Sequence, residues 1–243
     1  QLNEERKHTE EALRWYGSVV EGEQYFAAQI RYASVLAKQG KLAEARKHLS
    51  QLAPKDNQQR IQIILTDAQL LRDAGRYQEA FDLLGRALQK NPDYPDLLYD
   101  YAMAAEKLNR LDVLEENLRK LIQLKPDYAH AYNALGYTLA DRTDRLGEAE
   151  QYIEQALKLA PEDPFIIDSM GWVQYRLGNL KEGTAYLRRA YADRPDPEIA
   201  AHLGEVLWVQ GKHEEAETIW KTSLKDNPGN EVLQNVIKKF VNK

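Results

Sequence analysis

The sequence predicts an all-α fold, a solenoid of antiparallel helix pairs closed by a capping helix. The main observation is a set of prolines at intervals of 33–35 residues, Pro92, Pro126, Pro161, Pro195 and Pro228. A second is that small residues recur at fixed distances from these prolines, and a third is a glycine or asparagine near the middle of most intervals. A period that persists through otherwise different sequence indicates a stacked repeat.

Numbering each repeat so that its closing proline is position 32 divides the chain into segments. Five full repeats are expected at 61–94, 95–128, 129–163, 164–196 and 197–229. A divergent repeat precedes them at 23–60, and a capping helix follows at 230–243, where Asn230 can cap the helix. Residues 1–22 are expected to form the trailing helix of a truncated repeat, because Ala12, Tyr16 and Val19 match positions 20, 24 and 27. The chain is therefore expected to be a fragment of a longer protein.

Each repeat is expected to hold two helices in close contact. Position 8 holds Ala68, Ala102, Gly136, Gly171 and Gly204, and position 20 holds Ala80, Leu114, Ala149, Gly183 and Ala216. These mostly small residues allow two helix axes to approach closely. The turn between the helices is expected at position 15, which holds Gly40, Gly75, Asn109, Gly178 and Gly211. Glycine and asparagine accept the left-handed conformation that ends many helices.

One repeat has a residue pattern that resembles the tetratricopeptide repeat family. The pattern consists of Tyr132, Leu135, Gly136, Ala149, Ala156 and Pro161. That resemblance implies a right-handed superhelix in which the first helix of each pair lines the concave face. The stretches 130–142, 168–178 and 196–208 also resemble Gram-negative multi-repeat adaptors, which are exported and lipid-anchored at the outer membrane. One such adaptor delivers substrates to a periplasmic carboxyl-terminal processing protease. This resemblance implies a periplasmic location with a lipid anchor in the missing N-terminal part; a cytoplasmic location is the alternative.

The composition argues against several function classes. The chain has 38 acidic and 33 basic residues, and no Lys/Arg block that would follow a phosphate backbone, so nucleic acid is not an expected partner. It has no cysteine, no glycine-rich phosphate loop and no Ser-His-Asp arrangement. The five histidines lack metal-ligand spacing. An ordinary polar helix position is the preferred interpretation of His130 and His202, and a position facing a groove is the alternative. We therefore expect no catalytic residues, no cofactor and no metal.

The candidate binding residues follow from the family resemblance, which places positions 2, 5, 9, 12 and 13 on the concave face. They are Tyr99, Met103, Asn133, Tyr137, Phe165, Asp168, Trp172, Tyr175, Arg176, Glu205 and Trp208. Aromatic side chains with a polar group are common anchors in protein interfaces. The alternative is that some of them only pack between first helices, and this applies most to Trp208. If Trp172 and Tyr137 are anchors, their replacement by alanine should weaken binding with little loss of helix.

The leading functional hypothesis is a non-catalytic scaffold or adaptor that binds a protein segment along this aromatic surface. A second hypothesis is a regulatory or substrate-recruiting domain of a larger enzyme. A third is a module that self-associates through an apolar face of the N-terminal half-repeat, formed by Leu13, Tyr16, Val19 and Val20.

Overall fold

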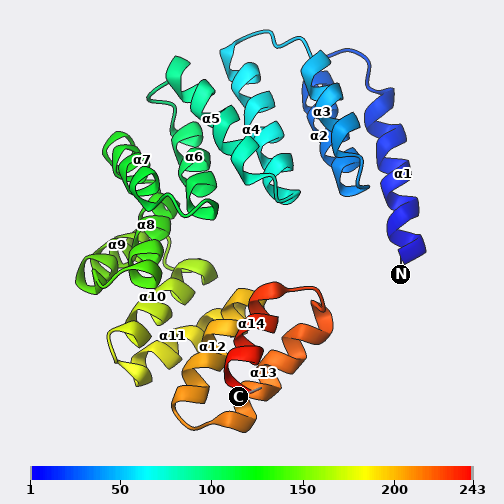
Figure 1. The fold of residues 1–243 in the computed structure, drawn as a ribbon. Coiled ribbons are helices and arrows are strands. Elements are labelled where there is room, and N and C mark those ends of the chain that lie inside the picture. Colours follow the sequence, from blue (N-terminus) through cyan, green and yellow to red (C-terminus); the bar gives the residue numbers. More distant parts are fainter. Residues whose placement is uncertain (1, 242–243) are drawn as a thin grey trace. The chain divides into compact units, whose positions relative to one another are not determined.

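A computed structural model describes residues 2–241, with side chains from residue 8 onward (Figure 1). Within this range the chain forms fourteen α-helices and no strand, which confirms the all-α prediction. It divides into two compact units, residues 1–124 (unit 1) and residues 125–243 (unit 2).

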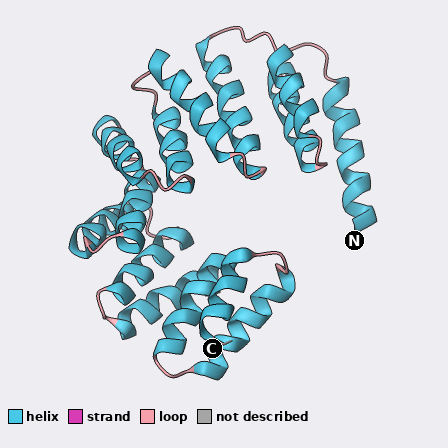
Figure 2. Ribbon diagram, in the orientation of Figure 1, coloured by secondary structure: helices cyan, strands magenta, loops and turns pink. Residues whose placement is uncertain are grey.

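Unit 1 contains α1 (Leu2–Ser18), α2 (Tyr25–Lys38), α3 (Leu42–Gln51), α4 (Asn57–Asp73), α5 (Tyr77–Lys90), α6 (Pro95–Lys107) and α7 (Leu111–Leu124). Unit 2 contains α8 (Ala129–Arg142), α9 (Leu146–Leu159), α10 (Pro164–Arg176), α11 (Leu180–Asp193), α12 (Pro197–Val209), α13 (His213–Asp226) and α14 (Glu231–Phe240). Short turns join the helices within each pair (Figure 2). The predicted boundary between residues 60 and 61 falls inside α4. This helix begins earlier because the Asp56 carboxylate accepts a hydrogen bond from the Gln59 backbone N–H at 2.8 Å.

The turns inside the repeats have the backbone conformation that the sequence predicts. The φ angles of Gly40, Gly75, Asn109, Gly178 and Gly211 are +79°, +71°, +56°, +89° and +80°. The turn between α8 and α9 has an extra residue and is closed by side-chain hydrogen bonds. There the Thr143 hydroxyl donates to the Leu139 carbonyl at 2.6 Å and accepts from the Arg145 N–H at 3.1 Å.

Close approach of paired helices requires glycine at position 8 in three repeats of unit 2. A Cβ added to Gly136 would lie 2.6 Å from Ile153 of α9, and one added to Gly171 would lie 2.6 Å from Leu187 of α11. A Cβ on Gly204 would clash with the Trp220 indole of α13. These contacts confirm the predicted role of small residues at this position.

Packing follows the order of the repeats within each unit. A first helix contacts its own second helix and the next first helix, as α8 contacts α9 and α10, and α4 contacts α5 and α6. At the C-terminal end, Leu233 and Val236 of α14 are buried on a cluster that includes Leu207 and Trp220. The Asn230 side chain accepts from the Leu233 N–H at 3.0 Å, so the predicted cap of α14 is confirmed. None of the helices described is both long and apolar enough to cross a bilayer.

Candidate functional site

A hollow of about 500 Å³ lies in unit 2 among the first helices of three repeats and the capping helix; we call it the unit 2 hollow. Its lining residues are Tyr137 and Asp141 of α8, Trp172, Tyr175 and Arg176 of α10, Ala201, His202 and Glu205 of α12, and Val232, Val236 and Lys239 of α14. The residues from α8, α10 and α12 occupy positions 5, 6, 9, 12 and 13 of their repeats. Aromatic and charged side chains thus converge on one surface.

His202 is the centre of a buried polar chain beside this hollow. Its Nδ1 lies 2.9 Å from a carboxylate oxygen of Asp168, and its Nε2 lies 3.2 Å from the Tyr137 hydroxyl. The imidazole also stacks on the Trp172 indole, with ring centroids 4.3 Å apart. The side chains of His202 and Asp168 are only 12% and 7% exposed, so water screens their interaction little.

The charge state of His202 follows from these contacts. Burial disfavours its charged form, but the negative charge of Asp168 and the hydrogen bond to it outweigh burial and raise the pKa of His202 above its ordinary value. The more distant Glu198 and Asp141 act in the same direction. In the protonated state Nδ1–H donates to Asp168 and Nε2–H donates to the Tyr137 hydroxyl, so both ring nitrogens are satisfied.

A second polar chain crosses from α10 to α14. The Tyr175 hydroxyl donates to the Glu205 carboxylate at 3.3 Å, and Lys239 Nζ lies 3.0 Å from the same oxygen. Burial, together with the Glu205 carboxylate, raises the pKa of Tyr175 to about 12, so its hydroxyl remains a donor at neutral pH. Beside them, Arg176 donates to the backbone carbonyls of Ala140 and Asp141 and so ties α10 to the end of α8.

Two polar atoms in this region are buried without a partner, the Trp172 indole Nε1 and the Asn133 amide Oδ1. Trp172 is 8% exposed overall, so most of its indole is packed inside unit 2. Its indole nitrogen contributes no hydrogen bond to the fold. The indole therefore stabilises unit 2 through packing and through its stacking on His202.

The structure brings together five of the eleven residues that the sequence proposes for binding. Tyr137, Trp172, Tyr175, Arg176 and Glu205 line the unit 2 hollow. The other six do not line it. Asp168 is buried against His202, and Phe165 lies under the Arg194 guanidinium. Trp208 packs on the rings of His213, Trp220 and Phe240. Asn133 is on α8 outside the lining, and Tyr99 and Met103 are on α6 of unit 1. Trp208 thus shows the packing that the sequence offered as its alternative.

His202 lines the unit 2 hollow but was left out of the binding candidates that the sequence proposes. Its assignment to an ordinary polar position is wrong, because its side chain is largely buried and contacts Asp168, Tyr137 and Trp172. One signal was available. Asp168 is at position 5 and His202 is at position 6 of the next repeat. An aspartate and a histidine can form an ion pair, and successive first helices lie side by side in a stacked repeat.

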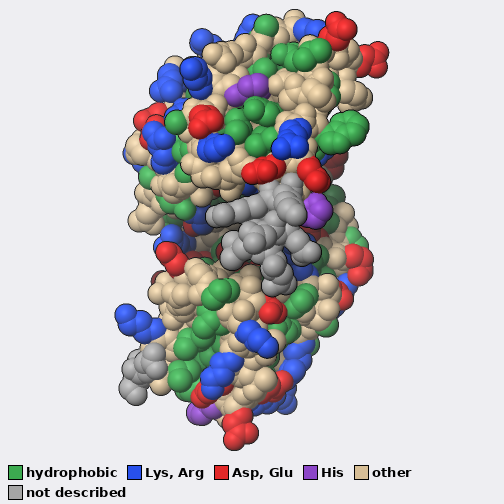
Figure 3. Space-filling view, turned by 90° about the vertical axis from the view of Figure 1, so that its right-hand side faces the viewer, with side chains coloured by type: hydrophobic (Ala, Val, Ile, Leu, Met, Phe, Trp, Pro, Cys, Tyr) green, Lys and Arg blue, Asp and Glu red, His purple; other side chains and the backbone are tan. Residues whose placement is uncertain are grey.

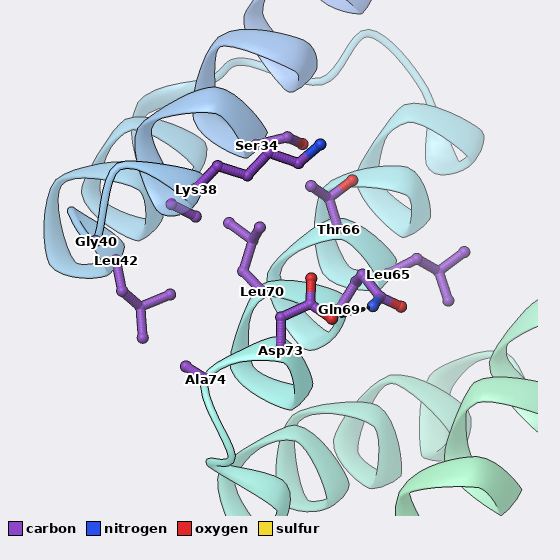
Figure 4. Close-up of a pocket in the computed structure, with 11 residues that line it drawn as sticks. Ser34, Lys38, Gly40, Leu42, Leu65, Thr66, Gln69, Leu70, Asp73 and Ala74 are labelled. Atoms are coloured by element: carbon purple, nitrogen blue, oxygen red, sulfur yellow. Dashed lines mark hydrogen bonds between the residues drawn. The ribbon is translucent and has the colours of Figure 1, made fainter. Parts of the chain in front are cut away.

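Unit 1 contains a larger hollow, of about 740 Å³, at the corresponding register (Figure 4). It is lined by Ser34, Ala37, Lys38, Gly40 and Leu42 from α2, α3 and their turn, and by Leu65, Thr66, Gln69, Leu70, Asp73 and Ala74 from α4 and its end. The hydrogen bond from Gln69 to Asp73 occupies one side of it (Figure 4). No aromatic side chain lines this hollow, whereas three aromatic side chains line the unit 2 hollow.

The surface charges are mixed in sign. Figure 3 shows Lys and Arg side chains interspersed with Asp and Glu side chains on the face that it presents. Within the described residues, no group of three His, Asp or Glu side chains lies close enough to hold a metal ion.

Comparison with known proteins matches three parts of the chain, residues 71–112, 129–163 and 169–231, to models of the tetratricopeptide repeat. The chain belongs to the tetratricopeptide repeat family. A protein from Pseudomonas aeruginosa, the TPR repeat-containing protein PA4667, is 44% identical over 204 residues, which cover 84% of this chain. The chain spans only 35% of that relative's length. A shorter match, 34% identical over 39% of this chain and 12% of the relative, is to the protein O-mannosyl-transferase Tmtc1 of Drosophila melanogaster.

Solved structures support the same fold. TTC0263, a TPR protein of Thermus thermophilus, superposes with a TM-score of 0.68 at 26% identity, covering 75% of this chain and 99% of that one. A tetratricopeptide repeat protein of Parabacteroides merdae gives a TM-score of 0.68 at 16% identity, covering 89% and 86%. YrrB, described as a TPR protein with an unusual peptide-binding site, gives 0.52 at 20% identity, covering 73% and 91%. The tetratricopeptide repeat is a protein-interaction scaffold, which sets the general class of this chain.

Proposed function

We propose that the chain is the binding part of a non-catalytic adaptor and that the unit 2 hollow receives a segment of a partner protein. The observation that carries this proposal is the convergence of Tyr137, Trp172 and Tyr175 with the charged groups of Arg176 and Lys239 on one hollow. Aromatic edges and hydroxyls supply contact area, while the charges fix the register of a bound chain. Lys239 is paired with Glu205, but its side chain is 58% exposed, so its ammonium can also contact an incoming carboxylate.

The proposal extends to the longer protein. We place it in the envelope of a Gram-negative bacterium, lipid-anchored at the outer membrane, where it delivers substrates to a protease or an assembly machine. The resemblance to multi-repeat adaptors supports the envelope setting, and the 44% identity to the Pseudomonas aeruginosa protein supports a bacterial one. Bound segments of substrate would occupy the unit 2 hollow while another part of the protein holds the machine.

A matched pair of exposed valines tests the docking surface. Val232 of α14 lines the hollow and is 43% exposed, whereas Val209 of α12 is 48% exposed and does not line it. Val232→Glu and Val209→Glu therefore introduce the same charge at similar exposure in the same unit. The intact chain and both variants are used to capture proteins from a Pseudomonas aeruginosa envelope extract, which are identified by mass spectrometry. Each captured protein is then purified and its affinity for the three chains is measured.

The expected result is a partner whose affinity falls at least tenfold with Val232→Glu, about 1.4 kcal/mol, and stays unchanged with Val209→Glu. Equal affinity for both variants would contradict docking at the hollow, although the general role as a protein scaffold would stand. Circular dichroism of both variants checks that their helix content equals that of the intact chain.

A second candidate is a substrate-recruiting domain of a larger enzyme. The match to Tmtc1, a protein O-mannosyl-transferase, favours it, because only 12% of that enzyme aligns with this chain. The gene around the chain distinguishes the two candidates: an adjoining catalytic domain supports recruitment, and further repeats behind a lipid-attachment signal support the adaptor.

A further inference from the structure

The first helix of the structure, α1, packs on α2 in the register of a second repeat helix. The backbone of Gly17 approaches the ring of Tyr32, so that an added Cβ would lie 3.5 Å from it. In the next full repeat, Gly85 of α5 approaches Tyr101 of α6 in the same way, at 3.3 Å. Glycine and tyrosine occupy the same two repeat positions, 25 and 7, in both pairs. Hence α1 relates to α2 as α5 relates to α6.

The opposite face of α1 lacks the contacts that second helices make in every full repeat. At position 24, the residues Leu84, Leu118, Ile153, Leu187 and Trp220 are fully buried against their own first helices. The corresponding Tyr16 of α1 is partly exposed, and so is Ala12 at position 20. Trp15, at position 23, is 75% exposed, whereas Leu83, Asn117, Tyr152, Tyr186 and Ile219 at that position are all half-buried. An exposed tryptophan at a position that is elsewhere covered indicates an unfilled contact surface.

A hollow of about 480 Å³ lies where that contact would form. It is lined by Ala12, Trp15, Tyr16 and Val19 of α1 and by Gln24, Ala27, Ala28 and Arg31 in and just before α2. In a full repeat a first helix contacts its own second helix and the next first helix. Here α1 corresponds to the second helix of the repeat, and α2 corresponds to the next first helix. The hollow therefore has the two walls that hold a first helix.

We infer that this hollow is the seat of the first helix of a preceding repeat, supplied by polypeptide upstream of residue 1 in the longer protein. The length of the Pseudomonas aeruginosa relative, of which the chain spans 35%, leaves ample chain for it. This inference does not depend on docking at the unit 2 hollow.

The occupant must carry a small residue opposite Tyr16, as Gly204 lies opposite Trp220. It should also carry an aromatic residue at position 4 to cover Trp15. The pair Tyr132 and Tyr152, at positions 4 and 23, has ring centroids 6.3 Å apart and provides the model for this contact. The helix that fits this hollow is therefore amphipathic, with an aromatic residue at position 4 and glycine or alanine at position 8.

The self-association face expected from the sequence is altered by the structure. Leu13 is not part of an exposed face, because it packs on the cluster of Ala33, Leu36 and Leu49. The capping helix of a second copy is also a poor occupant. Its position 8 is Ile237, and its apolar Leu233 and Val236 are already buried in their own unit.

The test grafts a first helix of this chain onto α1. In the graft, residues 129–145 replace residues 1–8, so that α8 and its turn precede Thr9 as they precede Leu146 in the native repeat. This segment contains no tryptophan. The Trp15 signal is obtained as the difference in fluorescence between each protein and its Trp15→Phe variant. The matched control carries Gly136→Leu in the grafted copy only, which fills the space required by Tyr16.

In the grafted protein we expect Trp15 emission to move to shorter wavelength, acrylamide quenching of Trp15 to fall several-fold, and the Tm of unit 1 to rise. The Gly136→Leu control should lose all three effects. No protection of Trp15 in the graft, or equal protection in the control, would overturn the inference. So would an ungrafted chain that dimerises in sedimentation and returns to monomer with Trp15→Glu, because a second copy would then occupy the seat.

Discussion

The imidazole of His202 lies on the indole of Trp172, with ring centroids 4.3 Å apart and an angle of 26° between the ring planes. The same imidazole contacts Asp168 of α10 and Tyr137 of α8. Repeat proteins depend mainly on contacts between neighbouring repeats. His202 therefore adds a link that reaches across one repeat, from α12 to α8, and fixes three first helices beside the unit 2 hollow.

Replacing His202 with glutamine is expected to destabilise unit 2 in a pH-dependent way. The folded-state pKa of His202 is raised, so its stabilising contribution is present in full below its unfolded pKa of about 6.5 and is lost as the pH rises through the folded value. At pH 5.5 the loss should be about 3 kcal/mol, because a buried charged pair is broken. Urea unfolding of both proteins between pH 5.5 and pH 9 measures the difference.

The control for this series is His130→Gln, since the side chain of His130 is 56% exposed. Replacing this exposed side chain should change the unfolding free energy by no more than about 0.5 kcal/mol. A His202→Gln difference that stays constant across the pH range would show that the imidazole acts by packing alone.

Trp172→Ala is expected to lower the stability of unit 2 by about 3–5 kcal/mol, the usual cost of removing a large buried aromatic side chain. Weakened binding by this variant would then report on folding as well as on contact, so Val232→Glu is the cleaner probe. Trp172→Phe should cost distinctly less, because the indole Nε1 that it removes has no hydrogen-bond partner. Thermal unfolding of the two variants compares these costs, and equal losses would contradict the explanation.

Gly204→Ala should destabilise the pair of α12 and α13 by about 1–3 kcal/mol, as expected for overpacking. Its Cβ would meet the indole of Trp220, which is fully buried and cannot move aside. Gly147→Ala in α9 is the matched control, because no atom lies within 4 Å of its added Cβ. That control should gain about 0.4–1 kcal/mol from reduced freedom of the unfolded chain. Chemical denaturation distinguishes the opposite signs.

Asn109→Ala should lower the stability of unit 1 by about 1 kcal/mol, because alanine is strained in the left-handed region that asparagine tolerates. The φ of Asn109 is +56°, and it is the one non-glycine residue with positive φ within the described chain. Asn109→Gly is expected to be at least as stable as the native protein. A stabilising alanine at this position, seen as a raised Tm, would contradict the assignment of the turn.

The candidate site was only partly predictable from the sequence. The family resemblance, applied through the repeat numbering, proposed Tyr137, Trp172, Tyr175, Arg176 and Glu205, and these five residues line the unit 2 hollow. It did not identify Lys239 or Val232, since α14 is only part of a repeat and its angle depends on packing against Trp220. For Trp208 it left both binding and packing open, and the structure shows that indole packed on Trp220 of α13 and Phe240 of α14.

The sequence alone determined the all-α repeat, its period, its turns and the small residues between paired helices. These features are local, and each depends on backbone conformation or on the volume of one side chain. Only the tertiary structure showed that His202 is buried against Asp168 and that Trp172 is mainly a packing residue. These features depend on the distances between side chains from different repeats, and a period along the chain does not contain those distances.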